Sequence, residues 1–309
     1  MHITFCCTDT KAQPWLDGLQ AALPDAQVTQ WQPGADAADY AVVWAPPQQF
    51  FDEQRTLKSA FNIGAGVDAL TSLKISADIP IFRLEDAGMA AQMAEYVCHA
   101  VIRHFREFDA YEADEADSKW SYRRPLARRD FPIGVMGLGV LGKRVADALV
   151  QFDFPVLGWS QSAKTLDGVQ CFAGPAEFNE FLAATRVLVC MLPLTPETEN
   201  IVRHDTLSRL MAGAYVINVA RGHHVVDEDL SALIDSGHVA GAALDVFREE
   251  PLPPTHPFWK HPKIRVTSHM SARTYRGEGL RQITEKIKAL ANGVPIASLA
   301  GVVDLKKGY

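Results

Sequence analysis

Three glycines, Gly137, Gly139 and Gly142, impose the strongest constraint on how this chain can fold. The apolar run 133–136 predicts a strand before them, and 143–150 continues with helical spacing after them. At G-x-G-x-x-G spacing, the first glycine permits a tight turn, the second lets backbone approach a phosphate, and the third lets helix pack on strand. The helix N-terminus adds amide donors and partial positive charge. The segment predicts a dinucleotide site, with a plain turn in another doubly wound fold as the alternative.

Short apolar runs recur on both sides of this glycine motif, and a helical or turn segment separates each from the next. Such alternation is typical of parallel sheets whose strands are joined by helices. Strands are predicted at 3–7, 26–31, 40–44, 61–68 (which runs into a glycine turn) and 80–84, and then at 155–159, 187–192, 215–219, 239–246 and 264–268. We therefore expect an α/β protein with a doubly wound Rossmann sheet.

A long amphipathic helix is predicted from Met89 to Phe108, where apolar residues recur at three- and four-residue steps. Its apolar stripe is interpreted as core or subunit interface, and the interface alternative suggests a homodimer. An acidic patch at 112–117 and a basic patch at 123–129 follow it. Both are predicted to be solvated linker or contacts between subunits.

The domain boundary is predicted to lie in this long helix, because no Ser- or Gly-rich linker is present. A chain of 309 residues is long enough for two domains. We expect 99–275 to form the dinucleotide-binding domain. Residues 1–98 and 276–309 are expected to form a smaller, flavodoxin-like α/β substrate domain into which it is inserted. The active site is expected in the cleft between them, where domain closure would exclude water.

Composition is that of an ordinary globular protein, with 48% hydrophobic and 22% charged residues. A formal net charge of −7 argues against nucleic-acid binding as the main task. The five cysteines include no C-x-x-C pair, which favours free thiols in a reducing compartment, and no metal site is predicted. The N-terminus lacks a signal-peptide pattern, and no apolar stretch approaches membrane-spanning length. A cytoplasmic location without membrane contact is therefore expected.

Three polar residues follow predicted strands at positions where a doubly wound sheet binds its ligands. Arg221 could clamp a carboxylate through two parallel hydrogen bonds and polarise a neighbouring carbonyl. An ion pair with a nearby acid such as Asp227 or Glu228 is the alternative for this arginine. His269 ends a strand and Glu250 lies in a proline-rich loop, and a carboxylate beside a histidine favours the imidazolium that a general acid needs. A surface glutamate and a structurally satisfied loop histidine remain the alternative.

Several segments occur in the order found in one known family. They are Gly137-Leu138-Gly139-x-x-Gly142, Leu192-Pro193-Leu194-Thr195-Pro196-Glu197-Thr198, Asn218-Val219-Ala220-Arg221-Gly222, Ala243-Leu244-Asp245-Val246-Phe247, Glu250-Pro251-Leu252-Pro253 and His269. The chain resembles the D-isomer-specific 2-hydroxyacid dehydrogenases over nearly its whole length. The runs 64–68 and 92–97 look closest to the glyoxylate/hydroxypyruvate reductase A branch.

This resemblance implies a mechanism for reducing a short 2-oxo acid such as glyoxylate or hydroxypyruvate. Arg221 would hold the carboxylate and carbonyl of the substrate, and His269 would donate a proton to the carbonyl oxygen as hydride arrives. Glu250 would keep His269 protonated. The resemblance also implies substrate-binding roles for the backbone amides of Ala65 and Gly66, and Trp44 is a candidate pocket wall.

The same resemblance implies where a nicotinamide cofactor binds. Asp245 would accept from the carboxamide and Pro193 would line the cofactor cleft. The ribose loop has no acid at the usual position, and polar residues there could donate to a 2′-phosphate, which favours NADP while leaving NAD possible. The full set expected to bind the cofactor is Gly137, Leu138, Gly139, Val140, Leu141, Gly142, Ser160, Ser162, Lys164, Pro193, Val219 and Asp245.

Two other functions remain open. One is a different dehydrogenase of this family, acting on phosphoglycerate or a bulkier 2-oxo acid. The other is a non-catalytic nucleotide-sensing protein, as in the corepressors that resemble the family. The presence of Arg221, Glu250 and His269 together favours an enzyme over a sensor.

Overall fold

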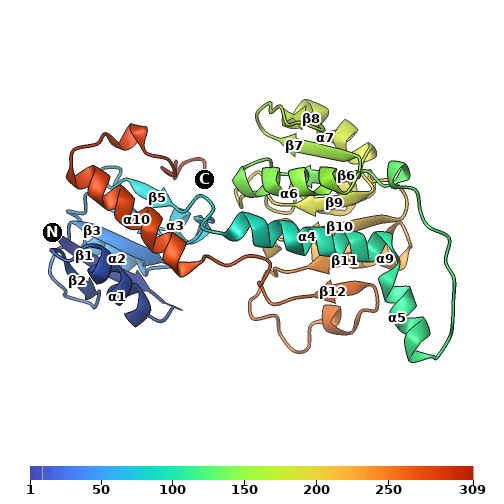
Figure 1. Ribbon diagram of the computed structural model, residues 1–309, viewed down its shortest axis with the longest axis horizontal. Helices are drawn as coiled ribbons and strands as arrows, with labels where there is room; N and C mark the ends of the chain where they lie inside the picture. The colour runs from blue at the N-terminus through green and yellow to red at the C-terminus, as the bar shows by residue number, and fades with distance from the viewer. Residues whose placement is uncertain (9, 309) are drawn as a thin grey trace. The chain divides into compact units, whose positions relative to one another are not determined.

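The computed structural model describes residues 1–8 and 10–308, which form two compact units (Figure 1). One unit comprises Met1–Met89 and Thr274–Tyr309, and the other comprises Ala90–Arg273. Both ends of the chain therefore build the first unit, and the second unit is inserted between them in sequence. Among the described residues, no helix is long and apolar enough to cross a membrane.

The first unit is built on a five-stranded sheet with the order β2-β1-β3-β4-β5. Every strand pairs with its neighbours in parallel, and β3 and β4 are buried along almost their whole length. Continuous burial indicates that both faces of the sheet are covered. The elements are β1 (His2–Cys7), α1 (Gln13–Ala22), β2 (Gln27–Gln30), β3 (Tyr40–Trp44), α2 (Gln48–Glu53), β4 (Ser59–Asn62), α3 (Asp68–Thr71), β5 (Ile81–Arg83), α10 (Arg276–Ala291) and the short 3-10 helix η4 (Ile296–Ser298).

The second unit is built on a seven-stranded parallel sheet with the order β12-β11-β10-β9-β6-β7-β8. Counted from β6 along the chain, this is the 3-2-1-4-5-6 order of the Rossmann fold with one further strand. The predicted α/β class and Rossmann sheet are thus confirmed. The strands are β6 (Ile133–Met136), β7 (Val156–Ser160), β8 (Val169–Ala173), β9 (Val187–Cys190), β10 (Ala214–Asn218), β11 (Val239–Leu244) and β12 (Ile264–Val266).

Helices join these strands and cover the sheet (Figure 1). They are α4 (Met89–Phe105), α5 (Phe108–Ala116), η1 (Arg128–Asp130), α6 (Val140–Gln151), α7 (Gly174–Ala183), α8 (His204–Leu207), η2 (Gly222–His224), α9 (Asp227–Asp235) and η3 (Pro257–Lys260). The chain reverses strand order between β6 and β9, and a doubly wound sheet binds its ligands at such a switch point, beyond the carboxyl ends of the strands.

The long helix ends earlier than predicted. Glu107 adopts a left-handed conformation with φ of 54°, which separates α4 from α5. The apolar stripe of α4, including Val97 and Val101, is buried in one core cluster with β6 and α6. This stripe is therefore core rather than a surface open to a partner. The boundary between the units lies at Met89–Ala90 rather than at residue 98, so nearly all of the helix belongs to the second unit.

Two parts of the second unit differ from the predictions. The acidic patch, expected to be solvated linker or a contact between subunits, forms the helix α5, which has no buried residue. β8 has no counterpart among the predicted strands, because it lies at the edge of the sheet and only Phe172 of its five residues is buried. All five cysteines are free thiols, as expected.

Candidate active site

Most of the predicted site residues come from one edge of the seven-stranded sheet. Gly137 follows β6, Pro193 follows β9, Arg221 follows β10, Asp245 follows β11 and His269 follows β12. Because all seven strands are parallel, their carboxyl ends lie on the same edge. These five residues therefore lie along the edge in the same order as they occur in the sequence.

The turn after β6 is shaped to receive a phosphate group. Gly137 has a φ of 102°, and a Cβ on Gly142 would lie 1.8 Å from the carbonyl oxygen of Gly137, so these positions require glycine. A Cβ on Gly139, in contrast, would meet no atom within 4 Å, so the turn is open at this point. The first amides of α6 have no partner within the helix and lie beside that opening. These residues fit the pyrophosphate of a dinucleotide.

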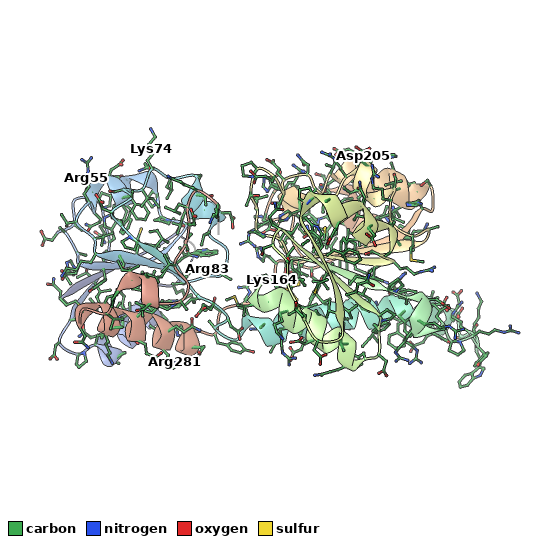
Figure 2. The ribbon with its side chains drawn as sticks, turned by 90° about the horizontal axis from the view of Figure 1, so that it is seen from above. Arg55, Lys74, Arg83, Lys164, Asp205 and Arg281 are labelled. Atoms are coloured by element: carbon green, nitrogen blue, oxygen red, sulfur yellow. The ribbon has the colours of Figure 1, made fainter. Side chains whose placement is uncertain are left out.

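The loop after β7 carries the three residues predicted to discriminate between the two nicotinamide cofactors. Ser160 is nearly buried, and its hydroxyl donates to the carbonyl oxygen of Ser162 at 2.7 Å. Its proton is therefore used within the loop. Ser162 and Lys164 are exposed, and Lys164 is labelled in Figure 2. Of the three, these two are the ones able to donate to an incoming phosphate.

The Arg221 turn is fixed by the Asn218 side chain and by close packing against the segment at Phe247. The Asn218 side-chain amide donates to the carbonyl oxygen of Arg221 at 2.9 Å, and its Oδ1 accepts from the amide of Ala220 at 3.1 Å. A Cβ on Gly222 would lie 1.8 Å from the carbonyl carbon of Phe247, so only glycine permits this approach. The turn therefore packs directly against the chain that leads to Glu250. Asp227, the alternative partner for Arg221, forms an ion pair with His256 at 3.5 Å.

Glu250 and His269 form the pair that their positions predicted. Nδ1 of His269 lies 2.7 Å from Oε2 of Glu250, and Oε1 of Glu250 accepts from the amide of Phe247 at 2.9 Å. Because the carboxylate engages Nδ1, Nε2 of the ring is the nitrogen directed elsewhere. Burial acts to raise the pKa of Glu250, but the bonds from His269 and Phe247 and the charge of Arg221 outweigh it, and the pKa is lowered. All three predicted catalytic groups are thus within electrostatic reach of one another.

Asp245 holds the loop that carries His269. Its carboxylate is fully buried and accepts from the hydroxyl of Thr267 at 2.5 Å and from the amides of Met270 and Ser271 at 2.9 and 2.8 Å. His269 itself has a φ of 50°, a left-handed conformation that costs free energy for a non-glycine residue and persists where its surroundings fix it. The amide of His269 donates to the carbonyl oxygen of Asp245 at 2.8 Å.

A tyrosine on α4 extends this network. The hydroxyl of Tyr96 lies 2.7 Å from that of Thr267, whose own proton goes to Asp245, so Tyr96 is the donor. Burial raises the pKa of Tyr96 to about 12, which keeps it a neutral donor near neutral pH. Helix α4 thereby helps to fix the loop of the candidate proton donor.

The first unit holds three of the predicted substrate-binding residues, Trp44 at the end of β3 and Ala65 and Gly66 in the loop after β4. The side-chain amide of Asn62 donates to the carbonyl oxygens of Gly64 and Gly66 at 3.0 and 2.8 Å, which fixes both carbonyls. Among the described residues, the amides of Ala65 and Gly66 have no hydrogen-bond acceptor. The Trp44 ring packs against Gly64. Trp44, Ala65 and Gly66 therefore lie together, with two amides available to an anion.

The remaining predicted cofactor-binding residues differ in whether their side chains are exposed or buried. Val140 has 52% of its surface exposed beside the glycine turn, and Pro193 is also exposed. Leu138 and Val219 are core side chains, so only their backbone can face a ligand. Sequence patterns gave no role to Asn218, His224 and Thr267, whose contacts depend on the folded loops. The position of Asn218 at a strand end was the only signal available for any of them.

Comparison with known proteins agrees with this geometry. Residues 98–271 match the sequence model described as D-isomer specific 2-hydroxyacid dehydrogenase, NAD binding domain. A relative from Serratia proteamaculans named glyoxylate/hydroxypyruvate reductase A is 44% identical over 316 residues, which cover 100% of both chains. A similarly named relative from Yersinia enterocolitica is 42% identical with the same coverage.

A solved structure shows the same likeness. A D-isomer specific 2-hydroxyacid dehydrogenase from Xanthobacter autotrophicus Py2, in complex with NADPH and MES, has a TM-score of 0.93 at 38% identity, covering 100% of this chain and 99% of that one. The chain belongs to the D-isomer specific 2-hydroxyacid dehydrogenases. Within them, the resemblance to the glyoxylate/hydroxypyruvate reductase A branch is also confirmed.

Proposed function

We propose that this enzyme reduces glyoxylate and hydroxypyruvate to the corresponding 2-hydroxy acids with NADPH. The single observation that carries the proposal is the 2.7 Å pair between His269 and Glu250, on the same sheet edge as Arg221 and the glycine turn. A proton donor, an anion-binding guanidinium and a nucleotide cradle would then share one unit. The two relatives at 44% and 42% identity carry the corresponding names.

The nicotinamide cofactor would supply a hydride when bound. The glycine turn at 137–142 would hold its pyrophosphate, with Val140 and Pro193 beside it. Three donors from the loop that carries His269 already engage the Asp245 carboxylate, which offers about four acceptor sites. The proposed bond from the carboxamide would be the fourth. Asp245 therefore both positions His269 and retains capacity for the cofactor.

The protein side chains then divide the work on the substrate. The Arg221 guanidinium binds the substrate carboxylate and polarises the carbonyl, because its planar fork donates two parallel bonds. Nε2 of His269 gives its proton to the carbonyl oxygen, while Glu250 stabilises the imidazolium. In the oxidative direction, neutral His269 takes the proton back. As the family resemblance implies, the amides of Ala65 and Gly66 would add donors to the substrate carboxylate, and Trp44 would limit the size of the substrate side chain.

The proposed preference for NADPH rests on the loop after β7. Ser162 and Lys164 are exposed there, and Ser160 is held within the loop. None of these three residues has a carboxylate, so none would repel a 2′-phosphate. A solved reductase from Sinorhizobium meliloti, described as NADPH-dependent and in complex with NADP and sulfate, has a TM-score of 0.92 at 32% identity over 100% of this chain and 99% of that chain. NADH remains usable, because nothing in the loop excludes it.

Steady-state kinetics on a set of 2-oxo acids with NADPH and NADH tests the proposal. We expect the highest kcat/KM for glyoxylate or hydroxypyruvate with NADPH. Higher kcat/KM for a phosphorylated or bulky 2-oxo acid would identify a different dehydrogenase of the family. NADPH binding without turnover of any 2-oxo acid would identify a nucleotide sensor and refute the catalytic assignment.

Replacing Glu250 with glutamine is expected to move the pH profile of reduction. Reduction draws a proton from His269, and the Glu250 carboxylate stabilises the imidazolium that supplies it. Without the carboxylate the imidazolium is less stable, so kcat/KM should fall, and most at the higher pH values of the profile. In the wild type, the lowered pKa of Glu250 keeps the carboxylate ionised further into the acid range, so the pair persists there. An unchanged profile in the glutamine variant would contradict the proposed role.

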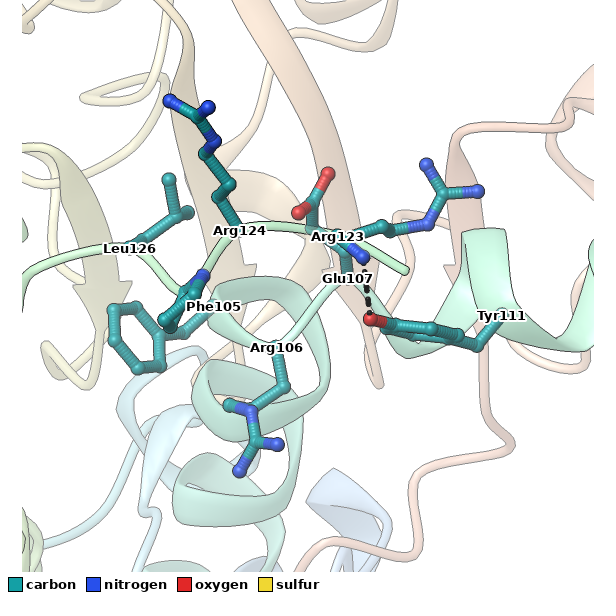
Figure 3. Close-up of a pocket in the computed structure, with 8 residues that line it drawn as sticks. Phe105, Arg106, Glu107, Tyr111, Arg123, Arg124 and Leu126 are labelled. Atoms are coloured by element: carbon teal, nitrogen blue, oxygen red, sulfur yellow. Dashed lines mark hydrogen bonds between the residues drawn. The ribbon is translucent and has the colours of Figure 1, made fainter. Parts of the chain in front are cut away.

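The proposed homodimer rests on the segment that follows α5. Trp120 and Tyr122 are 103% and 84% exposed, although large aromatic side chains are usually buried. Just beyond them, the amide of Arg123 donates to the Tyr111 hydroxyl at 3.1 Å beside a cavity of about 60 Å3, and these residues anchor the segment to α5 (Figure 3). Arg123 of the basic segment 123–129 pairs with Asp114 of α5 within the chain at 2.5 Å, and the exposed Arg124 would meet an acidic residue of a second copy across a two-fold axis.

Sedimentation velocity tests this interface. The wild type is expected to be a dimer, and the Trp120→Ser, Tyr122→Ser double variant is expected to be a folded monomer. A wild-type monomer, or a double variant that stays dimeric, would contradict the proposed interface.

We also propose a cytoplasmic location for the protein, because its five free thiols are typical of a reducing compartment.

A further inference from the structure

His224 lies fully buried between two loops of the candidate site, at the end of η2. Its Nδ1 lies 3.2 Å from the amide of Arg221, and its Nε2 lies 3.2 Å from the carbonyl oxygen of Pro193. The first loop carries the proposed carboxylate clamp, and the second belongs to the proposed cofactor cleft. A single imidazole thus connects the backbones of two segments that are 28 residues apart in sequence, counted from 193 to 221.

The hydrogen-bond partners assign the ring protons. A carbonyl oxygen only accepts, so Nε2 carries the proton that goes to Pro193. The carbonyl oxygen of Arg221 already accepts from the Asn218 side chain at 2.9 Å and from the amide of His224 at 3.2 Å. In the neutral ring, Nδ1 is therefore free to accept from the amide of Arg221, and both ring nitrogens are satisfied.

The connection does not depend on the charge of the ring. Burial disfavours the charged form, but Cys190 and the two backbone carbonyls outweigh it, and the pKa of His224 is raised. In the imidazolium, Nδ1 would donate to the carbonyl oxygen of Arg221, which lies 3.0 Å away, and Nε2 would still donate to Pro193. Both forms link the same two loops.

The Pro193 end of this connection is itself ordered. The carbonyl oxygen of Pro193 also accepts from the Thr198 hydroxyl at 2.6 Å, and that hydroxyl oxygen accepts from the amide of Thr195 at 2.8 Å. The loop therefore turns around one carbonyl group that receives two donors. Removing either donor leaves this carbonyl with a single bond.

We infer that His224 is a positioning residue that sets the Arg221 clamp and the Pro193 loop relative to each other. The inference rests on the proposed function, because it assigns the two loops to substrate and cofactor. A positioning role differs from a purely structural role in one testable respect. The Nδ1 contact would hold the loop that binds the 2-oxo acid, and the Nε2 contact would hold the loop that binds NADPH. Losing the Nδ1 contact should weaken the 2-oxo acid, and losing the Nε2 contact should weaken NADPH.

Two amide variants separate the Nδ1 contact from the Nε2 contact. In His224→Asn, the short amide can still reach the backbone of Arg221 but not Pro193. In His224→Gln, the longer amide can donate to Pro193 but places no group at Nδ1. We expect His224→Asn to raise the Kd for NADPH, measured by calorimetry on the cofactor-free enzyme, about tenfold, with the KM for glyoxylate within about threefold of wild type. His224→Gln should show the reverse pattern.

Two further variants keep the test decisive. Thr198→Val removes the other donor to Pro193 without touching His224, and it should weaken NADPH like His224→Asn even if the histidine variants do not fold. His238→Asn is the control, because His238 makes an equivalent bond to the carbonyl oxygen of Leu207 at 3.1 Å, at the amino end of β11. It should change neither constant.

The outcomes separate this inference from the proposed function. Wild-type turnover with a crossed pattern in the two variants supports both. Wild-type turnover with equal changes in both constants, or with lost thermal stability and no change in either, overturns the positioning role alone. Absence of wild-type turnover refutes the proposed function. In that case, unchanged NADPH binding in both His224→Asn and Thr198→Val would refute the inference as well.

Discussion

The His269→Ala variant is expected to reduce glyoxylate with a kcat about 10²–10⁴-fold below that of the wild type, the loss typical of removing a general acid. The side chain is half-exposed and, among the residues that the structure describes, bonds only to Glu250, so the fold should be retained. The KM for glyoxylate should change much less than kcat, because proton donation matters most in the transition state. Single-turnover rates with saturating NADPH measure the effect on the chemical step.

A neighbouring histidine provides the control for this experiment. His261 lies in the same unit, and its ring contacts Lys263 and Asp235 rather than Glu250. His261→Ala should therefore keep kcat near the wild-type value. If His269→Ala also kept a near-wild-type rate on the best substrate, the assigned proton donor would be wrong.

The second large effect is expected for Arg221→Gln. A charge-assisted hydrogen bond contributes about 1.5–3 kcal/mol, so losing two parallel bonds should lower kcat/KM by roughly 10²–10⁴-fold. The more conservative Arg221→Lys keeps the positive charge but loses the planar fork, and it should recover only part of this loss. Both the KM and kcat should change, because the guanidinium binds the carboxylate and also polarises the carbonyl.

An exposed arginine in the same unit serves as the reference. Arg209→Gln changes the net charge in the same way without altering the sheet edge, and should leave kcat/KM within about twofold. Equal effects of Arg209→Gln and Arg221→Gln would indicate a general charge effect instead of a clamp. Retention of kcat/KM in Arg221→Gln would contradict the account of substrate binding.

Most of the fold could be predicted because its strands are buried on both faces. β6, β9 and β10 are continuous apolar runs, which is the pattern that parallel sheets require. β8 lacks this pattern because its edge position leaves it half-exposed. The acidic residues of α5 form a helix without an apolar face, so periodicity contains no signal for it.

The candidate site divides in a similar way. The positions of Arg221, Glu250 and His269 after strands were visible in the sequence, because a parallel sheet brings all carboxyl ends to one edge. Their mutual contacts were not visible. The buried carboxylate of Asp245 shaping the His269 loop, and the ring of His224 between two loops, depend on backbone atoms that no residue pattern reveals.

The most direct test of the central claim follows the hydride itself. Hydroxypyruvate is reduced by the wild-type enzyme with NADPH that carries deuterium at the transferable C4 position, and the product is analysed by NMR and chiral chromatography. Hydride transfer beside Arg221 and His269 predicts glycerate with one deuterium at C2, and membership of the D-isomer specific family predicts the D configuration. Product without deuterium at C2, or of the L configuration, would contradict the account.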